Sequence, residues 1–151
     1  MPTEPEACGL LALMLHCEVR RGARYTRNGK FVPLDKQDTS LWLQGMIDEA
    51  EELLRSAASQ KRMGRYQLEA AIQSIHAHRA VSGCIDWEEI VLLYEGLVRI
   101  APGMGGLVGR AVAPAEAGRP AEGFATLGEI PSERIANYQP YWAARGICCG
   151  C

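Results

Sequence analysis

The sequence predicts an all-α protein of about seven helices that pack as antiparallel pairs. Two observations support this prediction. Apolar residues recur every three or four positions through most of the 151 residues, which is the spacing of one helix face. Turns that contain glycine or proline separate these periodic segments. With 48% apolar and 23% charged residues, the chain fits a single helical domain over residues 1–151 with a substantial core.

The first helix is expected over residues 6–24, with its end near Tyr25. Pro5 suits the first turn, where no backbone amide donor is needed. The apolar positions that follow helical spacing are Leu10, Leu11, Leu13, Met14 and Cys17.

A short hairpin or loop is expected near residues 26–37. Asn28-Gly29 forms a favoured turn pair, because both residues tolerate positive φ, and Phe31-Val32 follows on its far side. The tip of this segment should be exposed.

The second helix should begin at Asp38, Thr39 or Ser40, since each can cap the free amides of a first turn. It should run to about Ser59. Its acidic residues fill the face opposite the apolar stripe, which favours a solvated surface over a metal site. These acidic residues are Asp48, Glu49, Glu51 and Glu52.

Two further helices should follow in the middle of the chain. Gly64 marks a break before a helix over residues 66–80, whose stripe includes Arg79. Asp86 caps the next helix with Glu89 at its third position. That helix should end at Ala101-Pro102.

The last third of the chain resembles a tetratricopeptide unit. A helix over 107–117 and a helix over 121–130 flank the turn Gly118-Arg-Pro120, which is the helix, turn, helix layout of such a repeat. Pro114 should kink or stop the first of these helices, because it lacks an amide donor and clashes with the preceding turn. Another helix should start within residues 135–142.

Charge and hydropathy exclude some classes of protein. The formal charge of −2 gives no sign of a polyanion-binding protein, although it is compatible with local basic patches. Direct contact of this fragment with nucleic acid is not expected. The apolar run from Gly9 to Leu15 is far shorter than a bilayer span. Glu4 and Glu6 argue against a signal peptide. We therefore expect a soluble, cytoplasmic protein that does not enter a membrane.

The cysteines favour incidental or buried thiols over zinc or disulfides. Cys8, Cys17 and Cys84 stand alone, and no histidine lies near the terminal cluster of Cys148, Cys149 and Cys151 to complete a zinc set. A thiol-based redox sensor that uses Cys8, Cys17 and the terminal cysteines remains an alternative hypothesis.

Catalysis, cofactors and metals are not expected. His16, His76 and His78 are candidates for acid-base chemistry, but no Ser, Cys or carboxylate stands at a spacing that identifies a partner. His76 should pack within a helix pair, with His78 facing away. Residues 103–106 form a glycine-rich turn that does not follow a strand, so it lacks the context of a phosphate loop.

Several ordered blocks resemble one protein family. They are Glu4-Pro-Glu-Ala-Cys-Gly-Leu-Leu-Ala-Leu-Met-Leu-His16, Arg20-Arg21-Gly-Ala-Arg24, Leu34-Asp-Lys-Gln-Asp-Thr-Ser-Leu-Trp42, Tyr66-Gln-Leu-Glu-Ala-Ala-Ile-Gln-Ser-Ile-His-Ala77, Asp86-Trp87 with Leu92-Leu-Tyr94, and Arg110-Ala-Val-Ala113. The chain resembles the C-terminal extension of a subgroup of bacterial extracytoplasmic-function sigma factors. The family usually has Asn immediately before the Arg-Ala-Val-Ala block, whereas this sequence has Gly109 at that position.

The resemblance implies a tetratricopeptide-like domain that regulates transcription initiation. Its expected partners are the sigma domains of the parent chain, RNA polymerase or another protein. A free-standing helical-repeat adaptor is the alternative. The candidate interaction and structural residues are Arg20, Arg21, Arg24, Asp35, Gln37, Asp38, Trp42, Gln67, His76, Trp87, Tyr94 and Arg110.

A basic run leaves three interpretations open. It consists of Arg20, Arg21, Arg24, Arg27 and Lys30. It can meet phosphates, it can complement the dipole at a helix C-terminus, or Arg24 can form a salt link with Asp35 or Asp38.

The resemblance also implies that the chain is a fragment, since the sigma domains that bind DNA and polymerase precede this region in the family. Residues 146–151 depart from the family pattern and form, by hypothesis, a frameshifted tail. A shortened last helix would expose apolar surface and allow self-association. The residues of that surface are Ile135, Tyr138, Tyr141 and Trp142.

Overall fold

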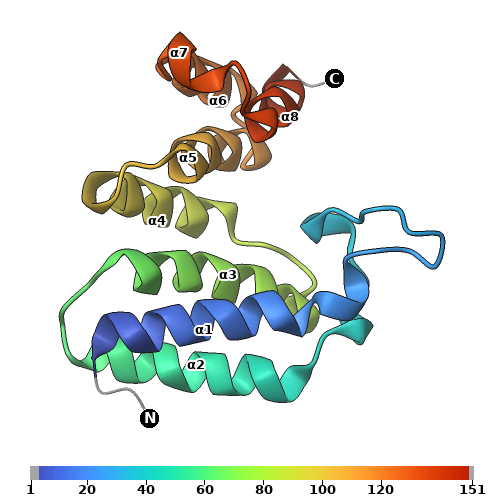
Figure 1. Cartoon of the computed structure of the whole chain (residues 1–151), viewed down its shortest axis with the longest axis vertical. Helices are drawn as coiled ribbons and strands as arrows, with labels where there is room; N and C mark the ends of the chain where they lie inside the picture. Colours follow the sequence, from blue (N-terminus) through green and yellow to red (C-terminus); the bar gives the residue numbers. More distant parts are fainter. Residues whose placement is uncertain (1–3, 150–151) are drawn as a thin grey trace. The chain divides into compact units, whose positions relative to one another are not determined.

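The computed structural model describes residues 4–149, and helices are the regular elements of that range (Figure 1). The described residues form eight α-helices and three short 3₁₀ turns, with no strand. The all-α prediction is therefore confirmed. The contacts group the chain into two compact units, Met1–Ile85 and Asp86–Cys151, here named the N-terminal and the C-terminal unit. The sequence predicted one domain, and each unit is described below by itself.

Three helices build the N-terminal unit. They are α1 (Pro5–Val19), α2 (Gln44–Ser59) and α3 (Arg65–Ser82), and α1 packs against both of the others (Figure 1). Small buried side chains let the three backbones approach closely. The buried residues of this core are Cys8, Ala12, Ala50, Leu53, Ala57 and Ala70.

The start of α3 is capped by a residue of α1. The two carboxylate oxygens of Glu6 accept hydrogen bonds from the backbone amides of Tyr66 at 3.0 Å and Gln67 at 3.1 Å. These amides have no partner within their own helix. A Cβ at Gly64 would overlap the Glu6 side chain, and one at Gly9 would lie 2.7 Å from the amide nitrogen of Gln67. Both glycines are therefore needed where α1 and α3 cross.

The first helix ends earlier than the sequence predicted. It stops at Val19, and a 3₁₀ turn over Arg21–Ala23 continues the chain. An isolated antiparallel bridge then joins Tyr25 to Phe31, around a turn in which Gly29 has a φ of +76°. The expected short hairpin or loop is thus present.

The predicted start of the second helix is wrong. Asp38 does act as a cap, but it caps the 3₁₀ turn Thr39–Leu41, and α2 begins at Gln44. The backbone of Trp42 is extended, with φ −80° and ψ 140°. This conformation carries the indole of Trp42 into a small core beside Val19 and Ile47. Burial of the large ring therefore outweighs the local capping signal.

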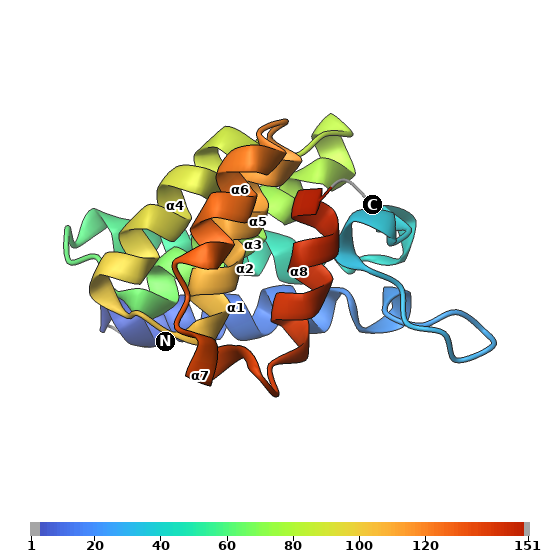
Figure 2. The same cartoon turned by 90° about the horizontal axis from the view of Figure 1, so that it is seen from above.

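Five helices form the C-terminal unit, with α5 (Met104–Glu116) at its centre (Figure 2). This helix packs against α4 (Trp87–Ile100), α6 (Pro120–Gly128) and α8 (Gln139–Cys149), while α7 (Ser132–Ile135) is a single turn. The core consists of Val108, Ala111, Leu127, Ile130, Tyr141, Ala144 and Cys148. The predicted helix, turn, helix layout corresponds to α5 and α6, joined at Gly118 with a φ of +91°.

Pro114 does not stop its helix, so the early stop that the sequence offered as one of two predictions is wrong. The helix continues to Glu116 with Pro114 buried inside it. Because Pro114 lies in the last turn, the missing amide removes a single hydrogen bond near the helix end. The carbonyl of Pro114 still accepts from the amide of Arg119 at 2.9 Å, which closes the turn.

The helix expected to start within residues 135–142 is divided in two. One turn ends at Ile135, and α8 begins at Gln139, where Pro140 fits the first turn. Tyr141 is buried and Trp142 is exposed. Residues 146–149 continue α8, and Cys148 packs in the core. The rest of the suspected tail, residues 150–151, lies outside the described residues.

Candidate functional site

Arg79 of α3 holds the loop that joins α1 to α2. Its Nη2 donates to the carbonyl oxygens of Leu34 at 2.8 Å and Gln37 at 3.2 Å. Its guanidinium carbon lies 5.2 Å from the centroid of the Trp42 ring, within the range of a cation–π contact. Because the planar group does all three at once, Arg79 fixes the loop in one conformation. Gln37, Trp42 and Arg79 are here named the loop clamp.

Gln37 links two parts of the loop through its buried side-chain amide. Its Nε2 donates to the carbonyl of Val32 at 3.2 Å, and its Oε1 accepts from the indole Nε1 of Trp42 at 3.3 Å. Both side chains are buried. A buried amide or indole N–H needs such partners, since an unpaired one is unfavourable. The two predicted residues Gln37 and Trp42 thus act together.

The arginines that the sequence singled out face different partners from those expected. Arg24 does not pair with Asp35 or Asp38. Its Nη2 donates instead to the carbonyl of Cys17. Arg21 pairs with Glu18 at 3.0 Å, which agrees with a role at the helix end. Burial lowers the pKa of Arg20, which is half-buried.

The two predicted aspartates also have local partners. Asp35 pairs with Lys36 at 3.2 Å. Asp38 Oδ1 accepts from the hydroxyl of Ser40 at 2.7 Å and from its amide at 2.9 Å. These hydrogen bonds lower the pKa of Asp38. Both aspartates therefore shape the exposed loop and do not anchor the basic run.

His76 lies among positive charges beside the loop clamp. Burial lowers the pKa of His76 to about 4, and the charges of Arg20 and Arg79 lower it further against the opposing effect of Asp35. His76 is therefore neutral at pH 7, which does not suit a general acid or base near neutrality. His78, two residues on, is exposed, as the sequence predicted.

A second polar group, which sequence reasoning missed, lies between the helices of the N-terminal unit. The Nε2 of buried His16 is 3.4 Å from Glu51 Oε1, and the Ser74 hydroxyl donates to the same oxygen. His16 and then the Ser74 hydroxyl lower the pKa of Glu51. The carboxylate stands between the other two groups. A nucleophilic triad needs the histidine in that place, so this order does not activate the serine.

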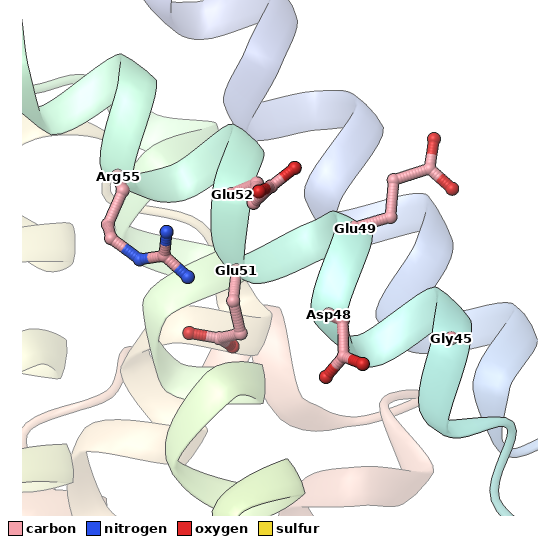
Figure 3. A pocket seen from close by; sticks show the side chains of 6 residues that line it. All are labelled: Gly45, Asp48, Glu49, Glu51, Glu52 and Arg55. Carbon is pink, nitrogen blue, oxygen red and sulfur yellow. The ribbon is translucent and has the colours of Figure 1, made fainter.

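Four carboxylates line a shallow pocket on α2 (Figure 3). Asp48, Glu49 and Glu52 are exposed, as expected for a solvated face. Figure 3 shows the carboxylates pointing in different directions along the helix. Within residues 4–149, no group of three or more His, Cys, Asp or Glu side chains is arranged to hold a metal ion. The pocket lining is completed by Gly45, Glu51 and Arg55.

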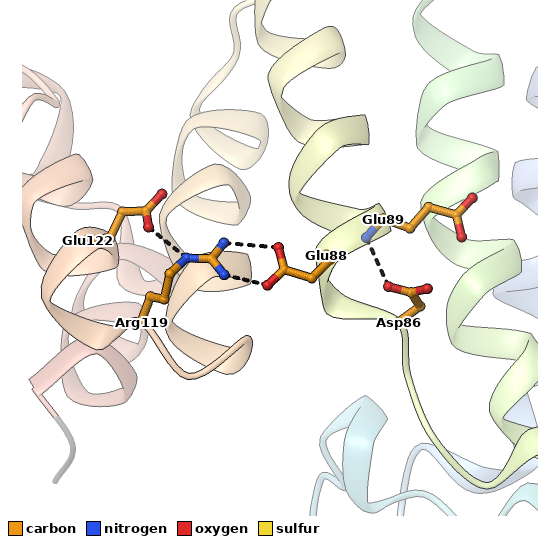
Figure 4. A network of polar contacts seen from close by, with 5 residues as sticks. All are labelled: Asp86, Glu88, Glu89, Arg119 and Glu122. Carbon is orange, nitrogen blue, oxygen red and sulfur yellow. Dashed lines mark hydrogen bonds and ion pairs between the residues drawn. The ribbon is translucent and has the colours of Figure 1, made fainter.

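Arg119 forms an ion-pair network in the C-terminal unit (Figure 4). Its guanidinium contacts both carboxylate oxygens of Glu88 on α4, and its Nε donates to Glu122 at 2.7 Å. Asp86 caps α4 by accepting from the amide of Glu89 at 3.1 Å, as the sequence predicted. The network fastens the α5–α6 turn to α4.

The other predicted residues lie apart from the loop clamp. Gln67 is buried and donates to the carbonyl of Arg62 at 2.6 Å. Arg110 pairs with Glu95 at 2.8 Å. The ring of Tyr94 occupies the space beside Gly109, and Trp87 is half-buried at the start of α4.

Arg79 and Arg119 were missed as site residues. An arginine within the apolar stripe of residues 66–80 was the available signal for Arg79. No sequence pattern pointed to Arg119.

The cysteines of α1 cannot bridge each other. Cys8 and Cys17 are nine positions apart on one helix, a rise of roughly 13 Å, whereas a disulfide needs Cα atoms within about 7 Å. Burial raises the pKa of Cys148. Cys84 and Cys149 are exposed. Any disulfide formed by a cysteine of α1 would therefore need a thiol from elsewhere.

These observations define a helical protein that holds a polar loop in a fixed conformation on its N-terminal unit. Comparison with known proteins adds two matches. Residues 1–58, which include Gln37 and Trp42, match the family described as "Family of unknown function (DUF6596)". The chain is also similar to an uncharacterized protein of Rhizobium meliloti (strain 1021), with 40% identity over 145 residues.

The relative is much longer than this chain. The match covers 96% of the chain and 34% of the relative, so the chain spans about a third of the length of the curated protein it matches. No solved structure matches. Among the described residues, every helix is too short or too polar to cross a membrane.

Proposed function

We propose that the chain is a regulatory, protein-interaction domain of a bacterial extracytoplasmic-function sigma factor. It would modulate transcription initiation by contact with the sigma domains or with another protein. The carrying observation is that two family-like blocks are joined at one place. Gln37 and Trp42 belong to the block Leu34–Trp42, and Arg79, which contacts both, follows two residues after the block Tyr66–Ala77. The threefold longer relative is consistent with a domain inside a larger chain.

The loop clamp gives this proposal a contact surface. It holds residues 35–41 in place while Asp35, Asp38 and Leu41 remain exposed. A partner that binds a fixed loop does not have to order it, so less binding energy is lost to entropy. Two aspartates beside an exposed leucine suit a partner surface that combines basic and apolar side chains. Regulation then requires that the partner bind two states of the domain with different affinity.

A binding assay tests this proposal. The chain is immobilised and exposed to the sigma domains encoded in the genome of origin, expressed separately, with and without core RNA polymerase. Asp38→Ala and Leu41→Ala change the exposed loop, and Glu133→Ala and Met14→Ala are matched exposed controls outside it. Saturable binding that the loop variants weaken about tenfold, and the controls do not, supports the proposal.

Absence of binding by a chain that circular dichroism shows to be folded would contradict the proposal. It would favour the alternative of a free-standing helical-repeat adaptor. Binding that all four variants retain would place the contact elsewhere and remove the loop from the mechanism.

A further inference from the structure

A basic hairpin projects from the N-terminal unit. Residues 19–34 contain five Arg or Lys residues and no Asp or Glu. The amide of Thr26 donates to the carbonyl of Lys30 at 2.8 Å, and the amide of Lys30 donates to the Thr26 hydroxyl at 3.1 Å. In Figures 1 and 2 this segment, drawn in blue, extends away from the helices of its own unit. Residues 25–31 are here named the basic hairpin.

Two aromatic rings lie at the base of the basic hairpin. Tyr25 is 61% exposed and Phe31 is 65% exposed. Their ring centroids are 6.0 Å apart with an interplanar angle of 70°. Aromatic residues in such exposed positions are typical of interaction surfaces, because burying them on a partner is favourable.

The cations of the basic hairpin have no carboxylate partners. Within residues 4–149, no carboxylate lies within ion-pair distance of Arg27 or Lys30, whereas Arg21, Arg62 and Arg65 each have one. The hairpin therefore offers unpaired positive charge next to apolar rings. An acidic surface with an apolar border would complement it.

The same unit carries such a surface. The α2 pocket presents four carboxylates against one guanidinium, Arg55 (Figure 3). In the chain just before α2, Leu41 is 52% and Leu43 is 53% exposed. Gly45, on the pocket wall, has no atom within 4 Å of the position of a Cβ. This surface is here named the acidic α2 face.

We propose that the basic hairpin of one copy docks on the acidic α2 face of a second copy. Arg27 and Lys30 would meet Asp48 and Glu52, and the aromatic rings would cover the open surface at Gly45 and Leu43. Exposed ion pairs contribute little individually and are screened by salt, so this association is reversible and salt-sensitive. It goes beyond the proposed function and does not depend on it.

The ring geometry favours a protein partner over a nucleic acid. Proteins bind single strands through rings that stack on successive bases, whereas Tyr25 and Phe31 stand edge to face and present no pair of parallel faces. The formal charge of −2 also disfavours a polyanion.

Charge exchange between two variants tests the proposal. Sedimentation velocity of the whole chain over a wide concentration range is compared at low and high salt. The hairpin variant is Arg27→Glu with Lys30→Glu, and the face variant is Asp48→Lys with Glu52→Lys. Each variant alone should associate at least about tenfold more weakly than the unchanged chain. An equimolar mixture should regain association, because the reversed charges then meet.

The control variant is Arg99→Glu with Arg134→Glu, which reverses two exposed cations of the C-terminal unit. It should associate like the unchanged chain, and circular dichroism checks that every variant folds. A chain that stays monomeric at all concentrations in low salt overturns the proposal, as does a mixture that fails to regain association. Binding of an anionic oligonucleotide by a monomeric chain would assign the basic hairpin to nucleic acid instead.

Discussion

The guanidinium of Arg79 lies over the indole of Trp42, 5.2 Å from its ring centroid. One residue sits on the apolar stripe of α3 and the other follows a 3₁₀ turn in the loop before α2. The contact attaches the loop between α1 and α2 to α3, because Arg79 also donates hydrogen bonds to two backbone carbonyls of that loop.

Arg79→Ala should destabilise the chain by about 1–3 kcal/mol, since it removes two hydrogen bonds and the ring contact. Arg79→Lys should be intermediate, because lysine keeps the charge without the planar fork. Urea unfolding measures both. Arg99→Ala, at an exposed arginine of α4, is the control and should change stability by less than about 0.5 kcal/mol. Equal stability of Arg79→Ala and this control would show that the loop clamp does not stabilise the fold.

Gly109→Ala should destabilise the chain, although alanine is the better helix former. An added Cβ would overlap the ring of Tyr94, and overpacking of this kind costs about 1–3 kcal/mol. Gly105→Ala is the matched control on the same helix, because its Cβ would lie 3.8 Å from the nearest atom. It should stabilise by roughly 0.5–1 kcal/mol. Thermal unfolding of both variants checks the opposite signs.

Tyr94→Ala provides a second check on the same contact. Combined with Gly109→Ala, it should relieve the overlap, so the double variant should be more stable than the sum of the two single changes predicts. Additive effects would mean that Gly109 and Tyr94 do not contact each other.

Glu6→Ala should weaken the start of α3 by about 1–2 kcal/mol, as for the loss of a helix cap. Hydrogen exchange should accelerate at the amides of Tyr66 and Gln67, which Glu6 now binds. Glu52→Ala, at an exposed glutamate of α2, is the control. Unchanged exchange at these two amides would contradict the capping role of Glu6.

His76 should make the chain less stable in mild acid. Its pKa falls from its ordinary value of 6.5 to about 4 in the folded chain. The unfolded chain therefore takes up a proton first as the pH falls. The contribution of neutral His76 to the free energy of unfolding is fully present above about pH 6.5. It is lost progressively between there and about pH 4, by an amount on the order of 2–3 kcal/mol.

His76→Gln should flatten this part of the stability profile, measured by urea unfolding at a series of pH values. His78→Gln is the control, because His78 is exposed two residues away, and it should retain the full profile. A profile that is unchanged in the His76 variant would show that another group titrates in this range.

Helical periodicity predicted most of the helices, because most of them bury one apolar stripe that is visible in the sequence. The stripe predicted for α1 was wrong: Leu10 and Met14 are exposed, and small or polar side chains are buried instead, because they allow close approach of α2 and α3. The errors arose where a distant contact outweighed a local signal. Asp38 can cap a helix, but burial of Trp42 delays α2 to Gln44. Proline can stop a helix, but Pro114 lies in the last turn of α5, which ends two residues later at Glu116.

The candidate site was predictable in its residues but not in its geometry. Gln37 and Trp42 stood out in one block, yet their common partner Arg79 is 42 residues from Gln37 in sequence, beyond the reach of any local pattern. Likewise a salt link of Arg24 with Asp35 or Asp38 was one interpretation that the sequence left open, whereas the fold brings the carbonyl of Cys17 to Arg24. Side-chain partners across helices depend on the packing itself.

The contact between Glu6 and the start of α3 also has a consequence for synthesis on the ribosome. Glu6, whose carboxylate accepts the hydrogen bond, is synthesised 60 residues before Tyr66, whose amide donates it. While α1 and α2 leave the exit tunnel, the face of α1 around Gly9 has no helix to cover it. The nascent chain therefore cannot complete the core of the N-terminal unit until translation has passed α3, because Ala70 of α3 is part of that core.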